Sequence, residues 1–363
     1  MPIHKLYADR DEIAHPLVQQ ISAKLGVSAQ PVHDPNDLFK AIKTQGDPWQ
    51  TAKQLLWLTC NKGTFLKKCP GTRDYICCGY QILHIGTYCT MDCAYCILQG
   101  YFHPPVLQFF INQEDMLAEL DEALGRQEIL RIGTGEFTDS LIWEELTGLN
   151  ARLIRRFAEQ RKAILELKTK TTAIGAFKGI SHCRRTILSW SLNTPQVIRV
   201  QERGTAGLRA RMRAAAQAQE WGYPVAFHFD PMVIYPHAEE DYDEVIQMLF
   251  DHIAADNIAW ISLGTLRFMP ALRPIIKQRF PESNIIYGEF VPGLDGKMRY
   301  FKPLRIQLYR SMVESIRRLA PDVLIYLCME DEEVWQKSFG YTPEERGGLS
   351  KMLDDAAERV RER

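Results

Sequence analysis

The chain has 363 residues, of which 46% are hydrophobic and 25% charged, and its formal net charge is −1. This composition is typical of a folded globular protein and excludes collagen-like, disordered and strongly basic chains. Any affinity for nucleic acid must therefore come from a local basic patch. The sequence has no run of about 18 apolar residues and no signal-peptide core, so we expect no membrane partner. Nine cysteines without an export signal argue against a disulfide framework and predict a cytoplasmic protein.

Residues 1–75 form the first of three predicted parts. They combine mixed polar segments with a short basic stretch between Lys62 and Lys68. We interpret this part as an N-terminal helical region that leads into the main domain.

The second part, residues 76–265, alternates short β-type runs with amphipathic segments. The predicted strands are 81–86, 129–133, 163–168, 186–191, 224–230 and 258–263, and the predicted helices are 113–126, 140–161, 204–221 and 239–256. Such alternation indicates βαβ crossovers and therefore an α/β protein with a parallel sheet. Six units favour a partial (β/α)6 barrel of the TIM type, with its chemistry at the C-terminal ends of the strands.

The third part, residues 266–363, is expected to hold a basic β-hairpin followed by helices. Residues 267–318 contain eleven Lys or Arg but only four Asp or Glu. Two β-prone runs, 284–290 and 298–301, flank an Asp-Gly turn, which is a hairpin signal. The interleaved aromatic residues suggest a wedge that follows phosphates and stacks on bases. The alternative is a solvated edge of the barrel.

A loop after the first predicted strand carries Cys89, Cys93 and Cys96, with three and then two residues between them. Thiolates are preferred ligands of iron–sulfur clusters. A 4Fe–4S cluster has four irons, so three thiolates leave one iron open for a ligand that is not protein. A zinc loop or simply buried cysteines are the alternatives, but zinc sites more often use paired C-x-x-C units. The spacing resembles the radical S-adenosylmethionine (SAM) superfamily, in which the open iron holds the amino and carboxylate groups of SAM.

Polar residues follow the next strands, where a cofactor would bind. Thr134-Gly135-Glu136 ends the second strand, and its glycine permits a close approach while its carboxylate suits an ammonium group. Lys170 lies near the end of the third strand, and Ser191 and Asn193 lie at the end of the fourth. A lysine there could reach the SAM carboxylate, and the hydroxyl and amide could bind the carboxylate or the ribose. The alternative is that they are ordinary strand ends.

Taken in order, these motifs resemble the spore photoproduct lyase family of radical SAM enzymes. The resemblance extends from about residue 55 to 310. The matching motifs are Cys77-Cys78-Gly79-Tyr80, the cysteine loop with Ile97-Leu98-Gln99-Gly100-Tyr101-Phe102, Thr169-Lys170, Ser191-Leu192-Asn193, Gly204-Thr205, Gly222-Tyr223-Pro224 and the hairpin near Arg299-Tyr300.

The resemblance implies an enzyme with a 4Fe–4S cluster and SAM as cofactors. Its substrate would be the spore photoproduct, 5-thyminyl-5,6-dihydrothymine, in DNA. A 5′-deoxyadenosyl radical would remove hydrogen from carbon 6, the linkage would fragment, and two thymines would form. DNA containing thymine lesions and an electron donor of the flavodoxin or ferredoxin type would be its partners. Two alternatives remain: a related enzyme that acts on another substrate, and a non-catalytic nucleic-acid-binding protein with a structural metal.

Several residue roles follow only from this resemblance. Tyr95 would pack near the adenine of SAM, Lys170 and Ser191 would contact SAM, and Thr138 would replace a SAM-contacting serine. In the hairpin region, Tyr300 and Arg305 would face the lesion. The neighbouring Arg299 belongs to the same expected DNA contact.

The chain departs from the family pattern at two positions. Where the family has a cysteine that returns hydrogen to the product, the window 133–139 has none, and Glu136 falls at about that place. Where the family has a tyrosine after the third cluster cysteine, this chain has Ile97. The nearest replacement donors in sequence are Cys77 and Cys78, although a purely structural role is the alternative. We expect the remaining cysteines to serve in packing; they are Cys60, Cys69, Cys183 and Cys328.

Overall fold

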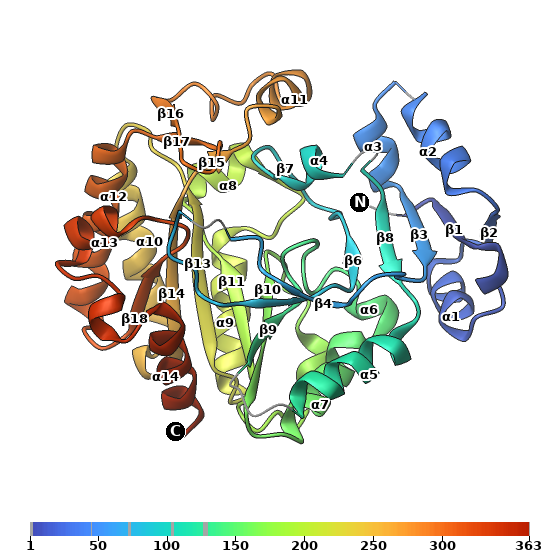
Figure 1. The fold of residues 1–363 in the computed structure, drawn as a ribbon, viewed down its shortest axis with the longest axis horizontal. Coiled ribbons are helices and arrows are strands. Elements are labelled where there is room, and N and C mark those ends of the chain that lie inside the picture. The colour runs from blue at the N-terminus through green and yellow to red at the C-terminus, as the bar shows by residue number, and fades with distance from the viewer. Residues whose placement is uncertain (1–2, 45, 72–73, 103–104, 126–129, 363) are drawn as a thin grey trace.

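The computed structural model describes residues 3–44, 46–71, 74–102, 105–125 and 130–362. Its largest sheet has eight strands and curls into a half-barrel (Figure 1). The strand order is β18 (Leu324–Leu327), β14 (Ile258–Thr265), β13 (Val225–Met232), β11 (Thr186–Ser191), β10 (Ala163–Thr169), β9 (Leu130–Gly133), β5 (Gln81–Leu83) and β4 (Leu66–Lys68). All neighbours pair in parallel except β4 and β5.

The predicted α/β partial barrel is confirmed, and each of the six expected strands contributes a strand to this sheet, although the first, expected over 81–86, ends at Leu83 and its last residue, Gly86, belongs to β6 of the other sheet. The structure adds β18 and the antiparallel β4, which the sequence analysis did not identify. Two expected end residues, Arg126 and Ile129, lie outside the described residues.

Alternate residues of the barrel strands differ in chemistry. In β10 the apolar Leu165 and Leu167 belong to the hydrophobic core, together with residues of the covering helices. Between them, the Glu166 carboxylate is hydrogen-bonded to His228 of β13 at 2.7 Å. Because successive side chains of a strand point to opposite faces, one face packs on helices and the other is polar.

The covering helices lie close to their predicted positions. They include α5 (Gln113–Leu124), α9 (Leu208–Glu220) and α10 (Ala238–His252). The single helix expected over 140–161 is instead divided into α6 (Glu144–Thr147) and α7 (Leu149–Ala158). Gly148, with a φ of 66°, ends α6 in the left-handed conformation that glycine adopts at low cost.

The N-terminal part is not purely helical, so that prediction was incomplete. Besides α1 (Pro16–Leu25), α2 (Pro35–Lys43) and α3 (Pro48–Lys53), it contributes three strands to a second sheet. That sheet has the order β2 (Ala29–Val32), β1 (Lys5–Asp9), β3 (Leu55–Thr59), β8 (Leu107–Phe110) and β6 (Gly86–Thr87). Every residue of β3 is buried, so it lacks the alternation that identifies a half-exposed strand.

The C-terminal part contains the expected hairpin as two strands of a three-stranded antiparallel sheet. Its order is β15 (Arg267–Phe268), β17 (Met298–Tyr300) and β16 (Phe290–Pro292). The first hairpin strand begins later than predicted, since residues 284–289 form turns. The helices of this part are α11 (Leu272–Arg279), α12 (Lys302–Leu319), α13 (Glu332–Phe339) and α14 (Leu349–Arg361). Among the described residues, no helix has the length and apolar character needed to cross a membrane.

Candidate active site

The cysteine loop is fixed by a segment that returns from the end of β11. Within the loop, β7 (Asp92–Cys93) pairs antiparallel with β12 (Glu202–Arg203). A hydrogen bond from the Ala94 N–H to the carbonyl oxygen of Gln201, 2.8 Å long, continues this pairing. At Gly204, which has a φ of 75°, an added Cβ would lie 3.6 Å from the Cα of Met91. The Gly204-Thr205 motif therefore lies directly against the cysteine loop.

Two cations that the sequence analysis missed hold the same loop. The buried ammonium of Lys53 donates to the carbonyl oxygens of Cys89, at 2.9 Å, and Met91. Arg279 of α11 donates to the Asp92 carboxylate at 2.8 Å. No local pattern could have identified either cation, because Lys53 and Arg279 are far from the loop in sequence.

The three predicted cluster ligands present largely enclosed thiols. Cys89 and Cys93 are buried and Cys96 is half-buried. Burial raises the pKa of Cys89 to about 12 and also raises the pKa of Cys93 and of Cys96. Within the described ranges, no three His, Cys, Asp or Glu side chains are placed to hold a single metal ion. A 4Fe–4S cluster binds each thiolate through a different iron, so three separate thiols on one loop are the kind of donor that such a cluster uses.

Next to the loop, the segment after β9 offers unused hydrogen-bonding groups. The buried hydroxyls of Thr134 and Thr138 have no partner in the described part of the chain. Asp139 is close enough to Cys89 to raise the pKa of that thiol further, after the larger effect of burial. Because buried hydroxyls are rarely left unpaired, this pair fits a bound polar ligand such as SAM.

The glycine in this segment is required by close packing. A Cβ added at Gly135 would lie 3.1 Å from the carbonyl oxygen of Lys168. Asp139 joins the same two segments, since its carboxylate accepts hydrogen bonds from the Lys170 N–H, at 2.8 Å, and the Thr169 hydroxyl, at 2.9 Å. The predicted positions Thr138 and Lys170 are thereby held beside each other.

Two other predicted SAM contacts have protein partners instead. Glu136 forms an ion pair with Lys168. The amide of Asn193 donates to the carbonyl oxygen of Pro231 at 2.8 Å and accepts from the Tyr242 hydroxyl at 2.7 Å. Both side chains thus have partners within the protein, and their predicted contacts with SAM stay predictions. Ser191, at the end of β11, is buried and lies close to the rim as expected.

Tyr95 is held by a buried carboxylate that the sequence analysis also missed. Its hydroxyl donates to Glu202, which is paired with Arg211 in addition. Burial opposes ionisation of Glu202, but the charges of Lys170 and Arg211 outweigh this effect and lower its pKa. The ammonium of Lys170 lies 5.9 Å from the centroid of the Tyr95 ring. Tyr95 and Lys170 therefore lie together beside the cysteine loop.

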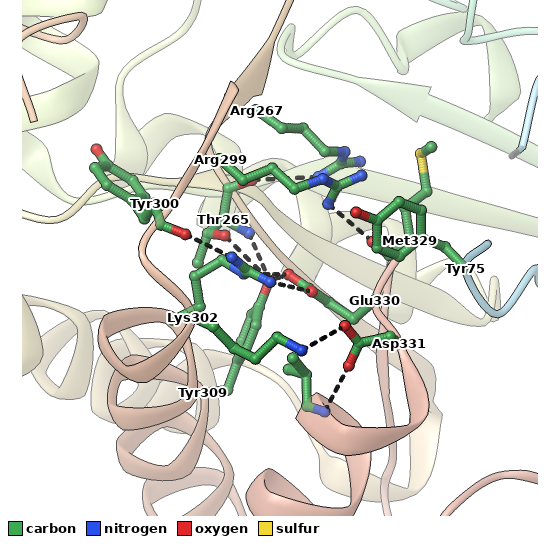
Figure 2. Close-up of polar contacts among 12 residues, drawn as sticks. Tyr75, Thr265, Arg267, Arg299, Tyr300, Lys302, Tyr309, Met329, Glu330 and Asp331 are labelled. Carbon is green, nitrogen blue, oxygen red and sulfur yellow. Dashed lines mark hydrogen bonds and ion pairs between the residues drawn. The ribbon is translucent and has the colours of Figure 1, made fainter. Parts of the chain in front are cut away.

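The three residues expected to contact DNA are almost fully enclosed. Arg299 and Tyr300 are each 2% exposed and Arg305 is 3% exposed. Arg299 donates to the carbonyl oxygen of Met329 at 3.0 Å and lies over the Tyr75 ring, as Figure 2 shows. The Arg305 guanidinium pairs with Glu330 at 3.0 Å.

These contacts attach the hairpin to the barrel. The three side chains are therefore not on the surface, where DNA could contact them. The Tyr300 hydroxyl accepts a hydrogen bond from the Ile234 N–H at 3.2 Å. Large apolar side chains of the same region do face outward, with Leu294 70%, Tyr287 63% and Phe301 49% exposed. The sequence analysis could not separate the two groups, because charge counts do not reveal which arginines have buried partners.

The two cysteines that we proposed as replacement hydrogen donors lie beside β18 of the barrel. Cys77 is exposed and Cys78 is partly buried, and the carbonyl oxygen of Cys78 accepts a hydrogen bond from Arg131 of β9. They line a small pocket together with Tyr326 and Cys328. Ile97, which departs from the family pattern, is 42% exposed beside Cys96.

A curled parallel sheet that holds a three-cysteine loop near its C-terminal strand ends defines the radical SAM class. The family model described as "Spore photoproduct lyase" matches residues 44–291. The chain belongs to the spore photoproduct lyase family.

Known relatives are distant in sequence but similar in fold. The spore photoproduct lyase of Clostridium acetobutylicum is 24% identical over 226 residues, which are 61% of this chain and 65% of that protein. That of Bacillus subtilis is 22% identical over 293 residues, covering 78% of this chain and 84% of that protein.

Two solved structures extend the similarity over most of the fold. A spore photoproduct lyase complexed with dinucleoside spore photoproduct has a TM-score of 0.79 and 20% identity, with 90% of this chain and 100% of that chain covered. A mutant spore photoproduct lyase with bound AdoMet and the same dinucleoside has a TM-score of 0.78 over the same shares.

Proposed function

We propose that this protein is a radical SAM lyase that converts the spore photoproduct in DNA to two thymines. The observation that supports this most directly is the fixed three-cysteine loop next to the unpaired hydroxyls of Thr134 and Thr138. Family membership and the ligands named for the related structures give the substrate class. When bound, a 4Fe–4S cluster with SAM supplies the one-electron chemistry that generates a 5′-deoxyadenosyl radical.

The residues of this chain hold the cofactors in place. Cys89, Cys93 and Cys96 bind the cluster, and Tyr95, fixed by its hydrogen bond to Glu202, packs against the adenine. The Lys170 ammonium binds the SAM carboxylate. The hydroxyls of Thr134, Thr138 and Ser191 complete the polar contacts with SAM.

We assign the return of hydrogen to the Cys77 and Cys78 pair, with Cys78 as the donor. The Cys78 thiol donates a hydrogen bond to Cys77 and thereby lowers the pKa of Cys77 to about 5. That hydrogen bond and burial raise the pKa of Cys78. Cys78 is therefore the less acidic thiol of the pair and the one that we assign as donor.

DNA would lie across the basic C-terminal part. Because Arg299, Tyr300 and Arg305 are enclosed, the exposed Leu294 and Tyr287 are the better candidates for contact with unstacked bases. An electron donor of the flavodoxin or ferredoxin type would reduce the cluster.

The test is an anaerobic reaction of the reduced, cluster-loaded protein with SAM and a dinucleotide spore photoproduct. We expect formation of thymine together with 5′-deoxyadenosine. Cleavage of SAM without any thymine would instead favour the second candidate, a family member acting on another lesion or base. The absence of a cysteine from window 133–139 and the presence of Ile97 are the observations that favour this candidate.

A further inference from the structure

A small pocket beside β18 is lined by four of the nine cysteines, namely Cys69, Cys77, Cys78 and Cys328. The remaining lining is mostly apolar and consists of Gly71, Tyr75, Ile76, Tyr326, Leu327 and Met329. The pocket lies between the segment around Ile76 and the end of β18. The Ile76 N–H donates to the carbonyl oxygen of Glu330 at 3.0 Å, which holds the two segments side by side. No three side chains there, among those described, are placed to hold a metal ion.

The four thiols differ sharply in accessibility and acidity. Cys77 is exposed, and hydrogen bonding from Cys78, the Gly79 N–H and the charge of Arg131 together lower its pKa to about 5, against the opposing effect of burial. Burial raises the pKa of Cys69 to about 11 and that of Cys328 to about 12. Of these four thiols, Cys77 is the exposed one and has the lowered pKa, so it is the nucleophile of this group.

The geometry favours an adduct on Cys77 over an internal disulfide. Adjacent Cα atoms across a trans peptide are about 3.8 Å apart, which is shorter than the roughly 4.4–6.8 Å of unstrained disulfides. Cys78 is therefore poorly placed to displace a group bound to its neighbour. Cys69 and Cys328 remain protonated near neutral pH and are weak nucleophiles.

We propose that Cys77 is a site of reversible mixed-disulfide formation with a small organic disulfide, with Cys78 as its positioning residue. The Cys77 thiolate attacks one sulfur of R–S–S–R, and the bond between the two R-bearing sulfurs breaks. The Cys77–S–S–R bond forms, and the second sulfur leaves as RS⁻ and takes a proton from water. Cys77 is oxidised and the departing sulfur is reduced, so no other oxidant is required. The apolar lining of the pocket receives the R group. The proposal does not depend on the lyase activity.

The test is treatment of the cluster-loaded protein with hydroxyethyl disulfide at about pH 6, under anaerobic conditions. Near this pH an ordinary thiol, with a pKa of about 8.5, is almost fully protonated. Intact-mass measurement and peptide mapping should find one adduct per chain, on Cys77, that dithiothreitol removes. Cys77→Ser should lose the adduct, and the matched control Cys183→Ser, at an exposed cysteine outside the pocket, should keep it.

The role of Cys78 is tested by two substitutions that differ in their ability to donate a hydrogen bond. Cys78→Ala should slow the reaction about tenfold at this pH if the pKa of Cys77 rises by about two units, because only about a tenth of a thiol with a pKa near 7 is ionised at pH 6. Cys78→Ser keeps a hydroxyl donor and should restore most of the rate. Equal rates in wild type and Cys78→Ala would overturn the positioning role. An adduct mainly on another cysteine, or a disulfide between Cys77 and one of its neighbours, would overturn the proposed site.

Discussion

The ammonium of Lys53 lies 2.9 Å from the carbonyl oxygen of Cys89 and 3.4 Å from the carboxylate of Asp92. It joins α3 of the N-terminal part to the loop that carries the three predicted cluster ligands. A buried cation with several acceptors restricts the loop to one conformation, because leaving those acceptors unpaired is costly.

We predict that Lys53→Met lowers cluster content. Hydrogen bonds to a charged group contribute about 1.5–3 kcal/mol each, so the loop should lose order and the protein should melt at a lower temperature. Iron and sulfide per chain after reconstitution measure the effect, and thermal unfolding of the metal-free protein measures the stability. Lys40→Met, at an exposed side chain, is the control. Full iron content in Lys53→Met would show that the loop does not need the contacts of Lys53 in order to bind a cluster.

The unpaired hydroxyls provide a test of SAM binding. Replacing Thr134 or Thr138 by Val removes a hydroxyl without breaking a hydrogen bond between described residues, so stability should change by less than about 1 kcal/mol. The Kd for SAM should rise about tenfold, which corresponds to roughly 1.4 kcal/mol. Equilibrium binding to the cluster-loaded variants provides the measurement.

A matched control for this test is Thr186→Val. Thr186 also has a buried hydroxyl without a partner in the described part of the chain, but it lies at the opposite, N-terminal end of β11. SAM affinity should be unchanged in this variant. A similar loss of SAM affinity in all three variants would mean that the loss does not come from hydroxyls at the C-terminal ends of the strands.

The His228 and Glu166 pair predicts a specific acid dependence. Burial opposes ionisation of Glu166, but His228 and Lys168 outweigh it and lower its pKa below the ordinary 4.5. The stabilisation is then present above pH 4.5 and is lost as the pH falls through the lower, folded-state pKa. Glu166→Gln should lower the free energy of unfolding by about 3–5 kcal/mol at pH 7, and by less in acid.

Urea unfolding of wild type and Glu166→Gln at neutral and acidic pH measures this difference. Asp355→Asn, which alters an exposed ion pair with Lys351, should change stability by less than about 1 kcal/mol at either pH. A Glu166→Gln effect that is equally large at both pH values would contradict the assignment.

Substitutions of buried residues in the hairpin region should affect stability, whereas substitutions of exposed residues there should affect DNA binding. Arg305→Ala leaves Glu330 buried without its cation and should cost about 3–5 kcal/mol of unfolding free energy. Leu294→Ala should change stability by less than about 1 kcal/mol and weaken binding to lesion-containing DNA. Chemical unfolding and DNA titration make the comparison. Unchanged DNA affinity in Leu294→Ala would remove this side chain from the proposed interface.

The donor assignment predicts a difference between two neighbouring cysteines. Both Cys77→Ala and Cys78→Ala should cleave SAM normally, but thymine yield should fall further in Cys78→Ala, which loses the transferable hydrogen. Quantifying 5′-deoxyadenosine and thymine in the same reaction separates the two steps. Normal thymine yield from both variants would exclude the pair as donors.

The sequence predicted features that depend on local pattern. Strand β11 was predicted with its observed bounds, because its apolar run is bounded by polar segments. The cysteine loop was predicted from the spacing of its three cysteines, which is also a local pattern. Lys53, Arg279 and Glu202 could not be predicted, since each acts through contacts with residues distant in sequence. The enclosure of the hairpin arginines could not be predicted, because Glu330, the carboxylate partner of Arg305, lies 25 residues further along the chain.

The cysteine loop depends on the N-terminal segment, because that segment supplies three strands of the five-stranded sheet that supports the loop. The chain leaves the barrel at β5, enters this sheet at β6 and only then reaches Cys89, so the loop has supports on two separate sheets. A protein trimmed to the family match, residues 44–291, would lack β1 and expose the buried edge of β3. Such a minimal version should be prone to pair with other chains along that edge.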